Sequence, residues 1–186
     1  YDAAKKFFRG FEAIRDAGSM FVWPAAARLS VQHRNDELVR LVEKMIAFML
    51  IVIIPAVALM WILPLDTYFD IIYKGKYSGA ADIFRILSLA ALAIPFSMNM
   101  FILGGMGEAR RFFRVTFASA VLSVVVALLL VPKIGVMGTA LSVITSYAVL
   151  AILSTASLSR RIPISISRAL GRWKDAREFI LKRFKT

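Results

Sequence analysis

The residues of this chain that could bind or react with a substrate are concentrated near its beginning. At about 100° of rotation per residue, polar and amphipathic side chains of residues 1–31 fall in one helical stripe roughly 60° wide, which consists of Lys5, Arg9, Glu12, Asp16, Ser19 and Trp23. Much of the remaining surface is apolar and consists of Ala3, Phe7, Phe8, Phe11, Ile14, Phe21 and Val22. The pattern predicts a helix with one polar face in an apolar bundle.

The cations of this helix are suited to holding an anionic group. The planar guanidinium of Arg9 can bind phosphate oxygens in a bidentate manner, and Lys5 adds a positive charge one turn away. A charge inside a membrane helix costs about 2.5–3.5 kcal/mol on insertion scales, so such a helix requires a water-filled cavity beside it. We therefore predict a cavity lined by Lys5, Arg9, Glu12, Arg15 and Asp16, with Asn99 from a later helix.

Other interpretations of the same residues remain open. Arg9 can form an ion pair with Glu12 three residues further on, which would leave the first turns at the membrane surface without a binding role. Glu12 and Asp16 can instead form a proton or sodium site that couples transport to an ion gradient. Asn99 can line the cavity, or it can form a hydrogen bond across helices.

The composition of the chain indicates that its solvent is lipid. Apolar residues make up 59% of its 186 residues and the mean hydropathy is +0.71, which is more than one water-soluble domain of this length can bury. Residues 45–64, 86–107, 115–132 and 134–159 contain no charge and approach the roughly 20 residues that a transmembrane helix needs. With the polar-faced helix, they predict an all-α polytopic membrane protein of five transmembrane helices, at about 1–31, 41–64, 83–107, 112–132 and 135–159.

Particular residues inside these spans predict how the helices bend and pack. Pro55 and Pro95 each remove a backbone hydrogen bond and favour a bend. Gly138, Ser142 and Ser146 recur every four residues and form a small-residue face that permits close contact with another helix.

The distribution of basic residues predicts the orientation of the bundle. One predicted side has 16 Lys and Arg residues, nine of them in the tail, and the other has four, which are Lys74, Lys76, Arg85 and Lys133. Because basic residues favour the cytoplasmic side, residues 160–186 are expected to form a cytoplasmic tail of a multi-pass protein of the cell inner (plasma) membrane. This tail is basic and amphipathic, with one apolar face made of Ile166, Leu170, Trp173, Ile180 and Phe184, as in helices that lie along a membrane surface.

Several other partners and chemistries are not expected. The chain has no cysteine, and its single histidine, His33, lacks a second ligand at metal-binding spacing. We therefore expect neither a metal site nor a cofactor. The net charge of +12 would suggest nucleic acid in a soluble chain, but here the basic residues lie between apolar blocks and indicate topology instead.

Four sequence blocks together resemble the polysaccharide-biosynthesis branch of the multidrug, oligosaccharidyl-lipid and polysaccharide exporter superfamily, which contains the O-antigen flippases. The first is the polar-faced helix, with Tyr1 and Ala4 at its beginning and Pro24 at its end. The others are IYKGKY at 72–77 followed by Ala80 and Ala81, GMGEAR at 105–110, and VPKIGVMGTA at 131–140. Glycines at 75, 107 and 135 lie where the chain leaves one span for the next, as turn residues do.

The resemblance implies a transporter rather than an enzyme. Such a protein has roughly a dozen spans in two related halves around a central cavity, and this chain would supply the last five, with the missing N-terminal half of the same protein as its partner. It would flip lipid-linked oligosaccharide or polysaccharide precursors across the membrane by alternating access. The substrate would be a polyprenyl-pyrophosphate-linked sugar, whose pyrophosphate the cations of the polar face would hold.

Two alternative functions remain. A multidrug or cation antiporter of the same superfamily would favour carboxylates and aromatic residues, whereas the polar-faced helix is rich in Lys and Arg. A membrane glycosyltransferase or ligase needs an acid, base or nucleophile at the membrane face. The predicted outer segment 65–85 contains no His or Glu, and its Asp66, Asp70 and Asp82 have no evident partner in the sequence.

Overall fold

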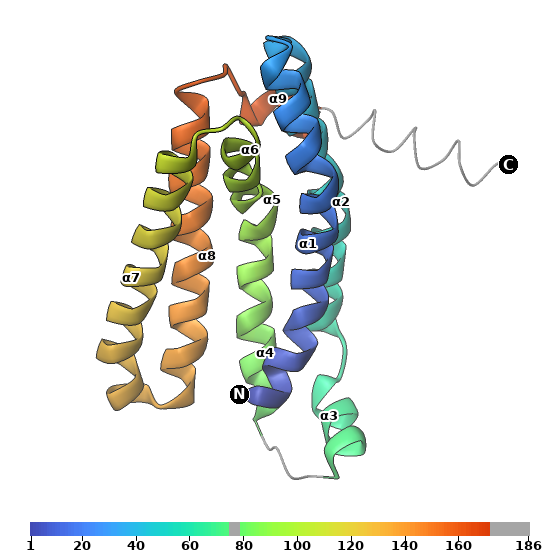
Figure 1. Ribbon diagram of the computed structural model, residues 1–186. Coiled ribbons are helices and arrows are strands. Elements are labelled where there is room, and N and C mark those ends of the chain that lie inside the picture. The colour runs from blue at the N-terminus through green and yellow to red at the C-terminus, as the bar shows by residue number, and fades with distance from the viewer. Residues whose placement is uncertain (75–78, 172–186) are drawn as a thin grey trace, which may run out of the picture.

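The computed structural model describes residues 1–74 and 79–171, and among these residues it contains helices but no strand. The elements, in chain order, are α1 (Asp2–Val31), α2 (Asn35–Ile62), α3 (Leu65–Tyr73), α4 (Ala80–Ser88), the 3-10 helix η1 (Leu89–Ala93), α5 (Ile94–Ser97), α6 (Asn99–Gly105), α7 (Ala109–Ile134), α8 (Val136–Ser159) and α9 (Ile166–Gly171). The long helices stand side by side (Figure 1). The predicted all-α polytopic membrane class is confirmed.

Within residues 1–74 and 79–171, the number of helices apolar enough to span a membrane is four, whereas five spans were expected. Helices long and apolar enough to cross a membrane cover Asn35–Ile62, Ala80–Gly105, Ala109–Ile134 and Val136–Ser159, each within a few residues of the predicted bounds. The exception is α1. Its 30 residues would extend about 45 Å, which is long enough, but the charges in its first half lower its hydropathy. It nevertheless runs along α2 and the α4–α6 segment within the bundle (Figure 1).

The core of the bundle is formed by α1, α2 and the α4–α6 segment. From α1 it receives residues at helical spacing, among them Phe8, Phe11, Val22 and Leu29. This buried side continues through Pro24, so α1 does not end at that proline, as the resemblance implied, but extends to Val31, the end of the predicted range 1–31. A proline removes one hydrogen bond from a helix, and the packing of the residues on either side keeps α1 continuous.

The two predicted bends have different outcomes. Pro95 lies in the first turn of α5 and directly follows the 3-10 helix η1, so the α-helical ladder is interrupted there. Beyond the proline the helical bonds resume, because the Ile94 carbonyl accepts the Met98 N–H at 3.1 Å and the Ser97 hydroxyl at 2.8 Å. Pro55, by contrast, lies inside the unbroken helix α2.

The small-residue face of α8 packs against α7, as predicted. The Ser119 hydroxyl donates to the Ser146 carbonyl at 2.8 Å, and the Ser123 hydroxyl donates to the Ser142 carbonyl at 3.1 Å. At Gly138 an added Cβ would lie 2.6 Å from the backbone of Leu130. The turns that precede α7 and α8 contain Gly107 and Gly135 at positive φ, which confirms these turn residues, whereas position 75 lies outside the described residues.

Ion pairs join neighbouring elements at both ends of the bundle. At the α3 end, Arg85 bonds the carboxylates of Asp66 and Asp82, each at 3.0 Å, so two of the three aspartates of this segment have a partner after all. At the opposite end, Glu108 pairs with both Arg111 and Arg161 and so joins the beginning of α7 to the end of α8.

The described beginning of the tail folds back against α2. In α9, Ala169 is fully buried, and the Arg168 Nε lies 3.4 Å from a carboxylate oxygen of the buried Glu43 in α2. The predicted surface helix extends beyond this point, and its Trp173, Ile180 and Phe184 lie outside the described residues.

Candidate functional site

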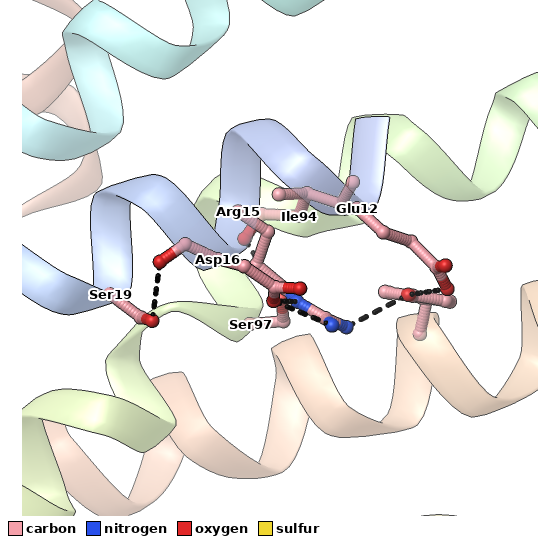
Figure 2. A network of polar contacts seen from close by, with 7 residues as sticks. Glu12, Arg15, Asp16, Ser19, Ile94 and Ser97 are labelled. Carbon is pink, nitrogen blue, oxygen red and sulfur yellow. Dashed lines mark hydrogen bonds and ion pairs between the residues drawn. The ribbon is translucent and has the colours of Figure 1, made fainter. Parts of the chain in front are cut away.

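A chain of polar contacts links the middle of α1 to the middle of α8. The Arg15 Nη1 donates to the Tyr147 hydroxyl at 2.9 Å, and this hydroxyl donates to a Glu12 carboxylate oxygen, also at 2.9 Å. The Arg15 guanidinium also donates twice to Asp16, at 2.9 and 2.8 Å. Figure 2 shows Glu12, Arg15 and Asp16 extending from one side of α1 toward the neighbouring helices. We call these four residues the Arg15–Tyr147 network.

The network exists because Arg15 lies on the core-facing side of its helix. It continues the spacing of the buried Phe8, Phe11 and Val22, so its side chain points inward and is only 23% exposed. Tyr147 is itself buried against Phe8, with ring centroids 5.8 Å apart in an edge-to-face arrangement. A long cationic side chain at such a position needs a polar partner, and the Tyr147 hydroxyl is that partner.

The network lies deep in the bundle, where a charge without a partner is costly. Tyr147 is the twelfth of the 24 residues of α8, so it lies roughly 18 Å along the helix from either end. This is near the middle of an apolar span, where an uncompensated charge is most costly. Inside the network Arg15 and Asp16 form an ion pair, whereas Glu12 accepts a hydrogen bond from the tyrosine hydroxyl.

A hollow of about 190 Å³ adjoins the network. Its lining combines a cation, a carboxylate and several hydroxyls with apolar groups, and consists of Tyr1, Lys5, Phe8, Glu12, Leu87, Ser123, Val143, Ser146 and Tyr147. We call it the α1–α8 hollow. It provides both charges and hydrogen-bonding hydroxyls at the place where α1 faces α7 and α8.

The six predicted site residues are only partly brought together. Lys5 and Glu12 line the α1–α8 hollow, and Arg15 and Asp16 extend from it through the network. Arg9 is exposed and does not line the hollow. Of the six residues, only Lys5 and Glu12 line the same hollow, and their role in binding a substrate stays a prediction.

Asn99 has the other role considered for it. It is fully buried, and its amide Nδ2 donates to the Thr155 hydroxyl of α8 at 2.9 Å. The neighbouring Ser154 hydroxyl donates to the Phe96 carbonyl at 3.1 Å. These bonds join α5 and α6 to α8 at a distance from the α1–α8 hollow, so the role of Asn99 is to connect helices.

The ion pair between Arg9 and Glu12, the alternative considered for these residues, is not formed. Among the residues that the structure describes, no carboxylate pairs with Lys5, Lys6 or Arg9. The Lys5 ammonium lies 5.9 Å from the centroid of the Tyr1 ring, a cation–π contact that leaves its charge unneutralised. Lys5 and Arg9 of the polar stripe are therefore left without an ion-pair partner in the described part of the chain.

Sequence reasoning missed Tyr147, the partner from α8. The available signal was a tyrosine near the centre of an uncharged span, because a buried phenolic hydroxyl needs a hydrogen-bond partner.

A second, larger hollow of about 640 Å³ between η1, α5 and α8 is almost wholly apolar, so it offers no charged group to a substrate. Within residues 1–74 and 79–171, no cluster of His, Cys, Asp and Glu is suited to a metal ion.

Comparisons with known proteins place the chain among membrane proteins. It is 30% identical over 110 residues to an uncharacterized membrane protein of Methanocaldococcus jannaschii. The aligned part is 59% of this chain but 22% of that relative, so the chain spans about a fifth of the relative's length. No protein-family model matches the sequence. No solved structure matches it either.

Proposed function

We propose that this chain is part of a transporter that flips a lipid-linked oligosaccharide or polysaccharide precursor across the cytoplasmic membrane by alternating access. The observation that carries this proposal is the Arg15–Tyr147 network beside the α1–α8 hollow at mid-depth of an apolar bundle. Ionisable residues at such depth occur where substrates or ions pass through a membrane protein. A purely structural bundle would have no need of them.

The charge of the α1 face favours an anionic substrate. Lys5 lines the α1–α8 hollow and Arg9 is exposed on the same stripe, and no described carboxylate neutralises either of them. A pyrophosphate offers two negative groups to such cations, and arginine can bind its oxygens in a bidentate manner. Cations without an ion-pair partner disfavour a cationic drug, the substrate of the antiporter alternative.

The partner of this face is proposed to be the N-terminal half of the same transporter. The chain corresponds to a small part of the relative that it matches, and its charged α1 stripe is one wall of a cavity whose opposite wall would come from that half. We place the tail and the Glu108 turn on the cytoplasmic side of the inner membrane, because most basic residues gather at that end of the bundle. Labelling of an Arg110→Cys variant by an impermeant reagent from outside the cell would contradict this orientation.

Neutralising the cations of the stripe tests the substrate. We expect Lys5→Gln and Arg9→Gln in the full-length protein to lower export at least tenfold when combined, since each phosphate contact of this kind contributes about 1.5–3 kcal/mol. The matched control is Lys6→Gln, which removes the same charge from the next residue without touching the α1–α8 hollow. The measurement is complementation of surface-polysaccharide export, with membrane abundance determined in parallel.

Two further variants separate binding from charge balance. Because Glu12 is bonded to Tyr147 rather than to Arg9, changing both Arg9→Gln and Glu12→Gln should leave export impaired. Arg9→Lys keeps the charge but loses the bidentate geometry, so partial export is expected. Normal export by the double variant at normal abundance, or an equal loss in Lys6→Gln, would refute the substrate role of the stripe.

A further inference from the structure

A third hollow, this one basic, lies at the far end of α1, where α1 and α2 meet. Its volume is about 400 Å³. One face of each helix lines it at i, i+3 and i+4 spacing, so the hollow is a groove between two regular helices. The lining residues are Ala25, Arg28 and Leu29 of α1 with Glu37, Arg40, Leu41 and Lys44 of α2.

The basic hollow has an excess of positive charge. In the part of the chain that the structure describes, no carboxylate forms an ion pair with Arg28, Arg40 or Lys44. The one acidic residue of the lining, Glu37, is already held by Arg34, whose Nε donates to it at 2.8 Å. Three cations therefore border a space that a phosphate group could enter, and the one carboxylate of the lining is already paired with Arg34.

The position of the hollow indicates that its ligand is a lipid. Lys44 is the last charged residue before the uncharged stretch 45–64 of α2, so the hollow lies at the boundary between the polar end of the bundle and its apolar body. The side chains of Leu29 and Leu41 add apolar surface beside the cations. A free phosphate would use the cations alone, whereas a phospholipid would use both surfaces.

We propose that this hollow is a binding site for one anionic phospholipid, with its phosphate held by Arg28, Arg40 and Lys44 and the beginning of its acyl chains against Leu29 and Leu41. Basic pockets between transmembrane helices commonly bind anionic headgroups in this way. The lipid would stabilise the α1–α2 turn at the membrane surface. This inference is independent of the proposed transport function, because it involves the opposite end of α1 and does not require a transported substrate.

The test is lipid binding to the full-length purified protein, measured by native mass spectrometry during titration with dioleoylphosphatidylglycerol. We expect the change of Arg28, Arg40 and Lys44 to Gln together to weaken binding roughly a hundredfold, and each single change roughly fivefold, as for basic residues near an anionic surface. A matched control neutralises Arg110, Arg114 and Arg160, three exposed arginines at the same end of the bundle that do not line the hollow. Thermal unfolding of each variant verifies that it is folded.

Two parallel titrations identify the source of the phosphate. Dioleoylphosphatidylcholine should bind at least tenfold more weakly than dioleoylphosphatidylglycerol, and soluble inorganic pyrophosphate should not displace the bound lipid. Equal binding by the control and by the triple variant of the hollow would overturn the site, because the cations would then act only as a diffuse basic belt. Displacement by pyrophosphate would overturn the lipid assignment in favour of a soluble anion.

Discussion

Helices α1 and α7 reverse the relation between hydropathy and burial that holds in soluble proteins. α1 has six charged residues between positions 5 and 16, and it still buries seven, which are Ala3, Ala4, Phe8, Phe11, Val22, Ala26 and Leu29. α7 contains a window of mean hydropathy 2.5. Yet along α7, which the structure describes throughout, only Val115 and Ser119 are buried.

The difference between the two helices shows what determines burial when the solvent is lipid. Lipid chains are as apolar as leucine, so hiding an apolar side chain from them brings little gain, and helices associate through close packing and polar contacts. α7 therefore meets α8 through Ser119 and Ser123 and leaves Leu128 and Leu129 outside, 70% and 60% exposed. α1 faces inward with Phe8, Phe11 and the Arg15–Tyr147 network.

The largest expected effect contrasts a phenylalanine from each helix. Phe11 of α1 is 7% exposed, whereas Phe117 of α7 is 58% exposed. We expect Phe11→Ala to destabilise the protein by about 3–5 kcal/mol, because it leaves a cavity in the core, whereas Phe117→Ala should change stability by less than about 0.5 kcal/mol. Thermal unfolding of the full-length protein in one detergent measures both. Equal losses would mean that α7 is buried against a partner as fully as α1 is.

A second contrast uses two glycines inside helices. A Cβ at Gly138 would lie 2.6–2.7 Å from the backbone of α7, whereas at Gly10 of α1 it would meet nothing within 4 Å. Gly138→Ala should therefore destabilise the α7–α8 pair by about 1–3 kcal/mol. Gly10→Ala should be neutral or stabilise the protein by up to about 1 kcal/mol through higher helix propensity. If Gly138→Ala unfolds at the wild-type temperature, the two helices do not depend on this close contact.

The last contrast removes a single oxygen atom from the protein. Tyr147→Phe keeps the ring against Phe8 but deprives both Arg15 and Glu12 of their shared partner. We expect a loss of about 1–3 kcal/mol. Combining it with Arg15→Met should cost less than the sum of the two single losses, because the residues are coupled. Tyr68→Phe in the exposed part of α3 is the control, and purely additive losses in the double-mutant cycle would show that the network is not an energetic unit.

Most of the local structure was predictable from the sequence, because its causes are local. Uncharged stretches gave the approximate bounds of four spans, Gly107 and Gly135 marked turns that need positive φ, and the spacing of Gly138 and Ser142 indicated a contact face. α1 continues through Pro24 and covers the predicted range 1–31, because residues on both sides of the proline are packed. The partner of Asp66 was missed, because Arg85 reaches it only after the chain reverses, whereas the Asp82–Arg85 pair was overlooked although its i,i+3 spacing is local.

The sequence by itself determined which side chains had to find polar partners, and the tertiary structure decided which partners they found. The cost of burying a charge follows from residue type and depth in a span, so the charges of α1 were a recognisable requirement before any fold was known. The bond from Arg15 to Tyr147 joins residues 132 positions apart. Periodicity along one helix cannot specify such a contact, because the rotation of α1 against α8 is set by all the helices packed around them.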